Sequence, residues 1–143
     1  MRKVLVAFDG SEHSIRALQY VIDSAGESAR PIEVHVLNVQ HGPVIYGDYT
    51  TASMIEDIND SLRVKARSVL EEAVALLQAA SITHETHVAL GNAAEQVSEA
   101  VKRLACDTVV MGTRGLGSFG GLLLGSVANR VIQEVAVPVI LVK

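Results

Sequence analysis

The sequence predicts an α/β fold, a single doubly wound, five-stranded parallel sheet with helices on both faces. Segments typical of strands and segments typical of helices alternate along the chain. The expected strands at 3–8 and 107–111 are almost continuous apolar runs, as in strands that a parallel sheet buries on both faces. Such alternation places a helix in each crossover between parallel strands. At 143 residues, the chain is predicted to be one domain, 1–143.

Apolar spacing and turn residues predict the first helix and the second strand. Ser11 follows the strand at 3–8 and is suited to cap a helix. Apolar residues then recur at helical spacing from Ile15 to Ala25, and Gly26 is expected to close this helix. A second strand is expected at 32–39.

The middle of the chain predicts a long loop, a long helix and a third strand. The segment 40–53 contains two glycines and a proline and is expected to be a loop. Apolar residues at helical spacing predict an amphipathic helix from Ile55 to about Ala80, and an alternating pattern predicts a strand at 82–90. The charged residues assigned to the solvated side of the helix are Arg63, Lys65, Arg67, Glu71 and Glu72.

The last third of the chain predicts two helices and two strands. Asn92 is expected to cap a helix that extends to Leu104 and leads into the strand at 107–111. A helix at 127–135 and a final strand at 139–142 follow.

The glycine-rich stretch at 111–127 is the strongest functional signal. It holds six of the eleven glycines and joins the fourth strand to the last helix. Glycine lets the backbone approach a ligand closely, and the N–H groups and dipole of a helix N-terminus favour an anion. The stretch therefore predicts a phosphate-binding loop, and a merely flexible connection is the alternative.

Two familiar phosphate motifs fit this stretch poorly. Residues 115–120 match the dinucleotide pattern G-x-G-x-x-G, but no acidic residue follows about 20 positions later at the end of a next strand. Residues 120–125 have the glycine spacing of a P-loop, but Ser126 stands where the phosphate-binding lysine should be.

A third pattern, G-x-x-G, nine residues, then G-[S/T], is met by Gly112, Gly115, Gly125 and Ser126. On this motif, and on the opening run at 4–11, the chain resembles the universal stress protein family, in its ATP-binding branch. The resemblance covers essentially the whole chain. It implies the strand order 3-2-1-4-5 and ATP, or ADP or AMP, in the crevice between the first and fourth strands. Mg²⁺ is expected to come with the phosphates, which supply most of its ligands.

The resemblance also implies which residues hold the nucleotide. Ala7 and Val39 would line the adenine, and Asp9 would lie beside the adenine and ribose. The residues implied for the ribose and phosphates are Gly112, Thr113, Arg114, Gly115, Gly125, Ser126 and Val127. The sequence pattern supports Asp9 and Gly112 independently, because they follow the first and fourth strands, whose ends meet at the crevice if the two strands are neighbours.

The last strand, Val139 to Val142, is the expected homodimer interface. Members of the family often pair this strand antiparallel with its copy, so the resemblance implies such a dimer. An apolar edge strand that stays exposed invites pairing, which supports the same expectation.

Charge, hydropathy and cysteine content exclude several functions. The net charge of −4 argues against nucleic-acid binding. No apolar run approaches the ~20 residues of a membrane span. The apolar run at the N-terminus is too short for a signal peptide, so a cytoplasmic protein is expected. The single cysteine, Cys106, is expected to be a small buried residue.

The spacing of the five histidines predicts no structural metal site. His84 and His87 are three residues apart on an expected strand and therefore point to opposite faces. The other three, His13, His35 and His41, share no ligand spacing.

The combined expectation is a cytoplasmic, ATP-binding stress-response protein that acts as a nucleotide-dependent sensor or regulator. No catalytic residue is predicted, because Asp9 is the only carboxylate expected at the crevice. Two alternatives stay open. One is a slow ATPase or autophosphorylating enzyme with Ser118 or Ser126 as the acceptor, and the other is a nucleotide-free dimeric scaffold.

Overall fold

Five parallel strands form one sheet in the order β3-β2-β1-β4-β5, which confirms the predicted topology. The computed structural model describes residues 1–42, 51–115 and 124–143. The strands are β1 (Lys3–Ala7), β2 (Glu33–Gln40), β3 (His84–Leu90), β4 (Thr108–Gly112) and β5 (Val139–Val142).

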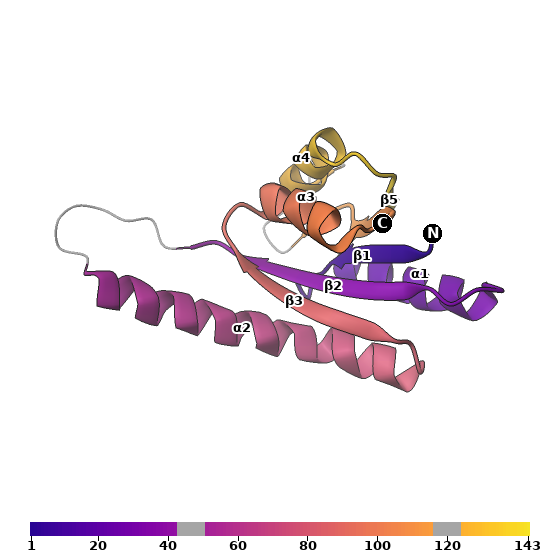
Figure 1. Ribbon diagram of the computed structural model, residues 1–143, viewed down its shortest axis with the longest axis horizontal. Coiled ribbons are helices and arrows are strands. Elements are labelled where there is room, and N and C mark those ends of the chain that lie inside the picture. Colours follow the sequence, from indigo (N-terminus) through magenta and orange to yellow (C-terminus); the bar gives the residue numbers. More distant parts are fainter. Residues whose placement is uncertain (43–50, 116–123) are drawn as a thin grey trace.

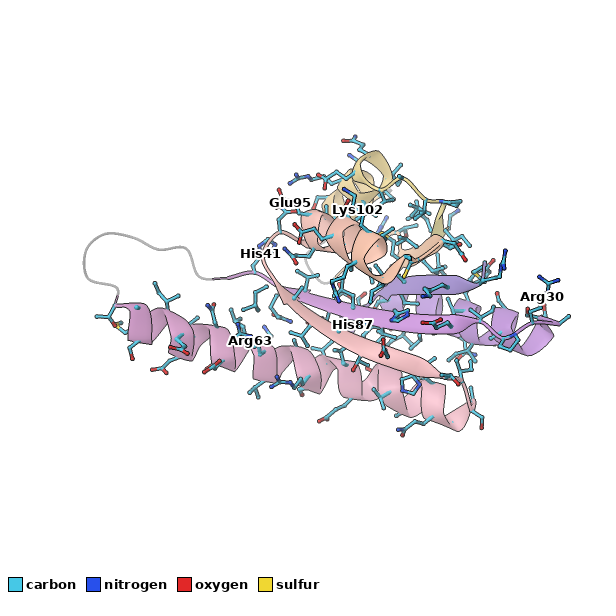
Figure 2. All side chains as sticks on the ribbon, in the orientation of Figure 1. Arg30, His41, Arg63, His87, Glu95 and Lys102 are labelled. Atoms are coloured by element: carbon cyan, nitrogen blue, oxygen red, sulfur yellow. The ribbon has the colours of Figure 1, made fainter. Side chains whose placement is uncertain are left out.

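Helices cover both faces of the sheet, with α1 and α2 on one face and α3 and α4 on the other (Figure 1). The helices are α1 (Glu12–Glu27), α2 (Ala52–Ala79), α3 (Ala93–Leu104) and α4 (Ser126–Glu134). None of these four helices is both long and apolar enough to span a membrane. Glu95 and Lys102 of α3 are exposed (Figure 2). The two faces of the sheet are thus both covered, as the apolar strands predicted.

Alternate residues of β1 divide the core into two layers. Val4 and Val6 pack with α1 and α2, whereas Leu5 packs with α3 and α4, and none of the three is exposed to solvent. Cys106 lies in the second layer, where burial raises the pKa of its thiol to about 11. The thiol therefore stays protonated and packs as a small apolar group, as expected.

Side chains at the predicted caps begin two of the helices. The Ser11 hydroxyl accepts a hydrogen bond from the N–H of Ser14 at 3.2 Å, and the Asn92 side chain accepts one from the N–H of Glu95 at 3.1 Å. Each cap satisfies an N–H group that has no partner inside the first helical turn. The caps predicted at Ser11 and Asn92 are confirmed.

Two helix boundaries differ from the sequence expectation. Gly26 does not close α1, which continues to Glu27 and has Ser28 as its C-cap. A glycine costs a helix only about 1 kcal/mol, which tertiary packing readily overrides. Helix α2 begins at Ala52, inside the segment expected to be a loop, because the Thr51 hydroxyl caps it. Other boundaries agree to within one or two residues.

Candidate functional site

The carboxyl ends of β1 and β4 lie side by side in the sheet. Ala7 at the end of β1 is in register with Met111 in β4. The chain winds outward from β1 through β2 to β3 and then returns to β4 on the other side of β1. The direction of winding reverses between β1 and β4, and ligands of open α/β sheets bind at such a reversal. Asp9 and Gly112 therefore meet at the edge where the sequence predicted a site.

Two adjoining cavities open at this edge. They measure about 550 and 740 Å³ and share Asp9, Val39, Gly115, Gly125 and Val127 as lining residues. The ten residues predicted to hold a nucleotide all line one or both cavities: Ala7, Asp9, Val39, Gly112, Thr113, Arg114, Gly115, Gly125, Ser126 and Val127. Their contact with a nucleotide stays a prediction.

Gly112 and Gly115 of the glycine motif occupy positions with no room for a side chain. A Cβ atom on Gly112 would lie 2.6 Å from Cβ of His13 and 2.8 Å from its backbone carbon, at the start of α1. A Cβ atom on Gly115 would lie 2.5 Å from a carboxylate oxygen of Asp9. The first glycine thus allows β4 and α1 to pack closely, and the second makes room for the Asp9 side chain.

A backbone hydrogen bond joins the two ends of the glycine-rich stretch. The carbonyl of Thr113 accepts a hydrogen bond from the N–H of Gly125 at 2.6 Å, and the N–H of Thr113 donates to Val142 in β5 at 2.9 Å. The start of α4 is therefore fixed against the end of β4. Ser118, which the sequence analysis considered as a phosphate acceptor, lies outside the described residues.

The N-terminus of α4 faces the second cavity with its first residues. Gly125 is the N-cap and has no side chain with which to cap the first turn, and Gly125, Ser126 and Val127 all line this cavity. The first N–H groups of a helix lack partners inside the helix and carry its positive dipole. This end of α4 is therefore suited to bind an anionic group.

The turn after β1 is held in place by a buried side chain that the sequence analysis missed. The side-chain amide of Asn38 donates to the carbonyl of Phe8 at 2.8 Å, and Gln40 donates to Asn38 at 2.8 Å. One oxygen of Asp9 accepts the N–H of Ser11 at 2.9 Å. The first two bonds hold the backbone of the turn, and the third holds the Asp9 carboxylate at the shared wall of the two cavities. An isolated asparagine at the end of a strand carries no sequence signal for this role.

Two positively charged side chains also line the cavities, in addition to the negatively charged Asp9. Arg114 is half-buried and lines the first cavity, and Lys65 projects from α2 into the lining of the second. The sequence assigned Lys65 to the solvated side of its helix, and it is indeed exposed. Helical periodicity could not show that this exposed position borders the cavity, because α2 and the strand ends meet only in the tertiary structure (Figure 1).

Comparison with known sequences identifies a family. The sequence model of the universal stress protein family matches residues 1–143. A universal stress protein of Thermus aquaticus, described as lying in the QAH/OAS sulfhydrylase 3′ region, is 34% identical over 144 residues, which covers 99% of this chain and 98% of the relative.

Several solved structures share the fold. The hypothetical protein MJ0577 superposes with a TM-score of 0.84 at 23% identity, covering 99% of this chain and 95% of its own. A universal stress protein in complex with cAMP gives 0.70 at 26% identity, covering 99% and 97%. A family protein from Arabidopsis thaliana with AMP bound gives 0.69 at 21% identity, covering 100% and 92%.

Proposed function

The chain belongs to the universal stress protein family, and from that premise we propose that it is a cytoplasmic, nucleotide-dependent regulator of the stress response. It binds ATP in the two adjoining cavities, with Mg²⁺ carried by the phosphates. ADP and AMP are ligands of the same class. Two structural neighbours hold cAMP and AMP, which supports an adenine nucleotide as the ligand.

The observation that carries this proposal is the pairing of an apolar cavity with a helix N-terminus. Ala7 and Val39 belong to the mainly apolar lining of the first cavity, which suits a base. The second cavity brings Ser126, the start of α4 and the ammonium of Lys65 to one place, which suits phosphates. Asp9 lies at the wall between them, where the ribose would sit.

Binding rather than catalysis fits the side chains present. Within the described ranges, Asp9 is the only carboxylate that lines either cavity. Phosphoryl transfer needs a group that orients the nucleophile near the terminal phosphate, and Asp9 is placed toward the nucleoside end in this proposal. The bound nucleotide would therefore act as a signal.

Calorimetric titration of the nucleotide-free protein with Mg-ATP is expected to give one site per chain. AMP and GTP serve as comparison ligands, and mass spectrometry identifies any nucleotide that co-purifies. At 100 times its Kd, ATP should stabilise the fold by roughly 2.7 kcal/mol, which raises Tm by roughly 5–10 °C for a chain of this length. No adenine nucleotide in the purified protein, together with no heat and no change in Tm, would overturn the proposal.

The exposed edge of β5 is the surface that we propose for homodimer formation. β5 is the last strand of the sheet, and its four residues are only half-buried. The carbonyl of Pro138 accepts a hydrogen bond from Val109 in β4, and the carbonyl of Val142 accepts one from Thr113, which follows β4. Because alternate residues of a strand direct their backbone groups to the same side, the N–H groups of Val139 and Leu141 point away from β4. They are the donors that a second copy of β5 would use.

Val139→Pro is expected to convert the dimer to a monomer. Proline removes one outward N–H group and leaves the hydrogen bonds between β4 and β5 in place. Sedimentation velocity measures the change. Thr86→Pro is the matched control, because Thr86 occupies an outward position on β3 at the opposite edge of the sheet. A wild-type monomer, or a Val139→Pro variant that still dimerises with full affinity, would contradict this interface.

A further inference from the structure

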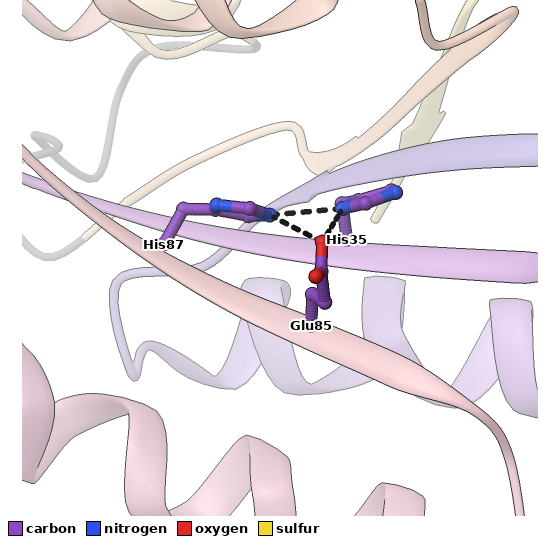
Figure 3. Close-up of side chains that lie close together, drawn as sticks. All are labelled: His35, Glu85 and His87. Atoms are coloured by element: carbon purple, nitrogen blue, oxygen red, sulfur yellow. Dashed lines mark hydrogen bonds and ion pairs between the residues drawn. The ribbon is translucent and has the colours of Figure 1, made fainter. Parts of the chain in front are cut away.

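Three side chains from β2 and β3 converge on the face of the sheet that α3 and α4 cover (Figure 3). His35 and Glu85 are register partners on the two strands, and His87 is the partner of Leu37, two residues further along β2. Nδ1 of His35 lies 2.8 Å from Nε2 of His87. One oxygen of Glu85 lies 3.3 Å from the former atom and 3.7 Å from the latter.

We propose that His35, Glu85 and His87 form a binding site for a divalent transition metal, with Zn²⁺ as the best match. Two imidazoles and one carboxylate are a donor set that zinc uses in proteins. Ligand atoms at about 2.0–2.1 Å from a tetrahedral zinc are about 3.3–3.4 Å from one another. The observed separations of 2.8, 3.3 and 3.7 Å bracket this value, so shifts of a few tenths of an ångström complete the site.

A fourth side chain orients the most buried ligand. Oε1 of Glu33 lies 2.8 Å from Nε2 of His35. A carboxylate at this position holds the imidazole proton on Nε2 and leaves the lone pair of Nδ1 directed at Glu85 and His87. Histidines that ligate metals commonly donate their other N–H to a carboxylate in this way. The partner required behind a metal-binding histidine is therefore already in place.

Burial leaves this site closed on one side and accessible on the other. The side chain of His35 is 4% exposed and that of His87 is 16% exposed, whereas that of Glu85 is 68% exposed. A metal can therefore enter past Glu85, and a water molecule can supply the fourth ligand on that side. None of the three residues lines the nucleotide cavities, so the metal site does not depend on the proposed nucleotide.

Sequence spacing could not reveal this cluster. His35 and His87 lie 52 residues apart, and only the parallel pairing of β2 with β3 brings them together. The expectation of no structural metal rested on local spacing alone. That expectation compared His87 with His84. His84 instead contacts the backbone carbonyl of Ile82.

Titration of the nucleotide-free protein with ZnCl₂, in buffer without chelator, is expected to show one Zn²⁺ per chain. His87→Ala removes a direct ligand and should weaken binding at least 100-fold, and Glu33→Gln should weaken it roughly 10- to 100-fold. His84→Ala, which removes a histidine of the same strand from outside the cluster, should bind Zn²⁺ like the wild type. Bound Co²⁺ should show the visible absorption of a tetrahedral site, and this absorption should be lost in His87→Ala.

Glu85→Ala keeps the test independent of folding, because Glu85 is largely exposed. It should also weaken Zn²⁺ binding at least tenfold, while circular dichroism shows an intact fold. The metal site would be ruled out if His87→Ala and Glu85→Ala bind Zn²⁺ as tightly as the wild type, or if the wild type binds none at submillimolar Zn²⁺. The cluster would then be a hydrogen-bonded histidine pair that serves only the fold.

Discussion

Gly115→Ala is expected to weaken the binding of Mg-ATP roughly 10- to 100-fold and to lower the stability of the nucleotide-free protein by only about 1 kcal/mol. The added methyl group would lie 2.5 Å from the nearer carboxylate oxygen of Asp9, so that side chain must turn away. Without nucleotide it can turn into the open cavity, at the cost of the hydrogen bond that it accepts from the N–H of Ser11. With nucleotide bound, that space is taken, and overpacking of this kind costs about 1–3 kcal/mol, where each 1.4 kcal/mol corresponds to about a tenfold loss of affinity.

A double-variant cycle separates this mechanism from a general disturbance of the loop. In an Asp9→Ala background the conflicting carboxylate is absent, so adding Gly115→Ala should cost little further affinity. Gly26→Ala is the matched control, because a Cβ atom there meets nothing within 4 Å. It should leave the Kd for ATP unchanged. An equal loss of affinity on adding Gly115→Ala with and without Asp9 would show that the carboxylate is not the cause.

The topology was predictable from the sequence because it depends on local patterns of apolar residues, which can be recognised within each segment of the chain. The apolar runs that become β1 and β4 are buried on both faces, and that burial follows from composition alone. The two strands then place Asp9 and Gly112 at one edge of the sheet. The family motif added the other cavity residues by position, and no property of an isolated residue would have identified Val39 or Val127.

The features of the site that could not be predicted from the sequence depend on contacts between distant segments of the chain. Asn38 matters because its amide reaches the carbonyl of Phe8 in the turn after β1, and Lys65 matters because α2 passes the second cavity. His35 and His87 meet only through the register of two strands. Local patterns describe which face a residue occupies, but they do not say which residue of another element shares that place.

The two glycines that open the motif, Gly112 and Gly115, therefore have different roles. Gly115 lies at the wall of the cavities and makes room for a side chain. Gly112 is buried at the end of β4, against the first turn of α1. A motif that is read as a single phosphate-binding signal thus combines a position that shapes the site with a position that holds the fold. A substitution at Gly115 should mainly change the affinity for the nucleotide, and a substitution at Gly112 should mainly change the stability of the fold.

Gly112→Ala is accordingly expected to lower the free energy of unfolding by about 3 kcal/mol, at the upper end of the usual range for overpacking. The new methyl group would meet Cβ of His13 at 2.6 Å and its backbone carbon at 2.8 Å. Neither atom can move without shifting α1 itself, whereas the conflict at Gly115 involves only the end of a side chain. Urea unfolding of the nucleotide-free protein measures the change, which corresponds to a fall in Tm of roughly 10 °C.

Gly26→Ala again provides the comparison for Gly112→Ala, because the same substitution is made inside a helix with open space around it. It should raise the free energy of unfolding by about 0.5–1 kcal/mol, since alanine is the better helix former. The two substitutions should thus change stability in opposite directions although each adds one methyl group. If Gly112→Ala unfolds at the urea concentration of the wild type, α1 and β4 do not pack as closely as the glycine requires, and the edge that carries Asp9 is not fixed in this way.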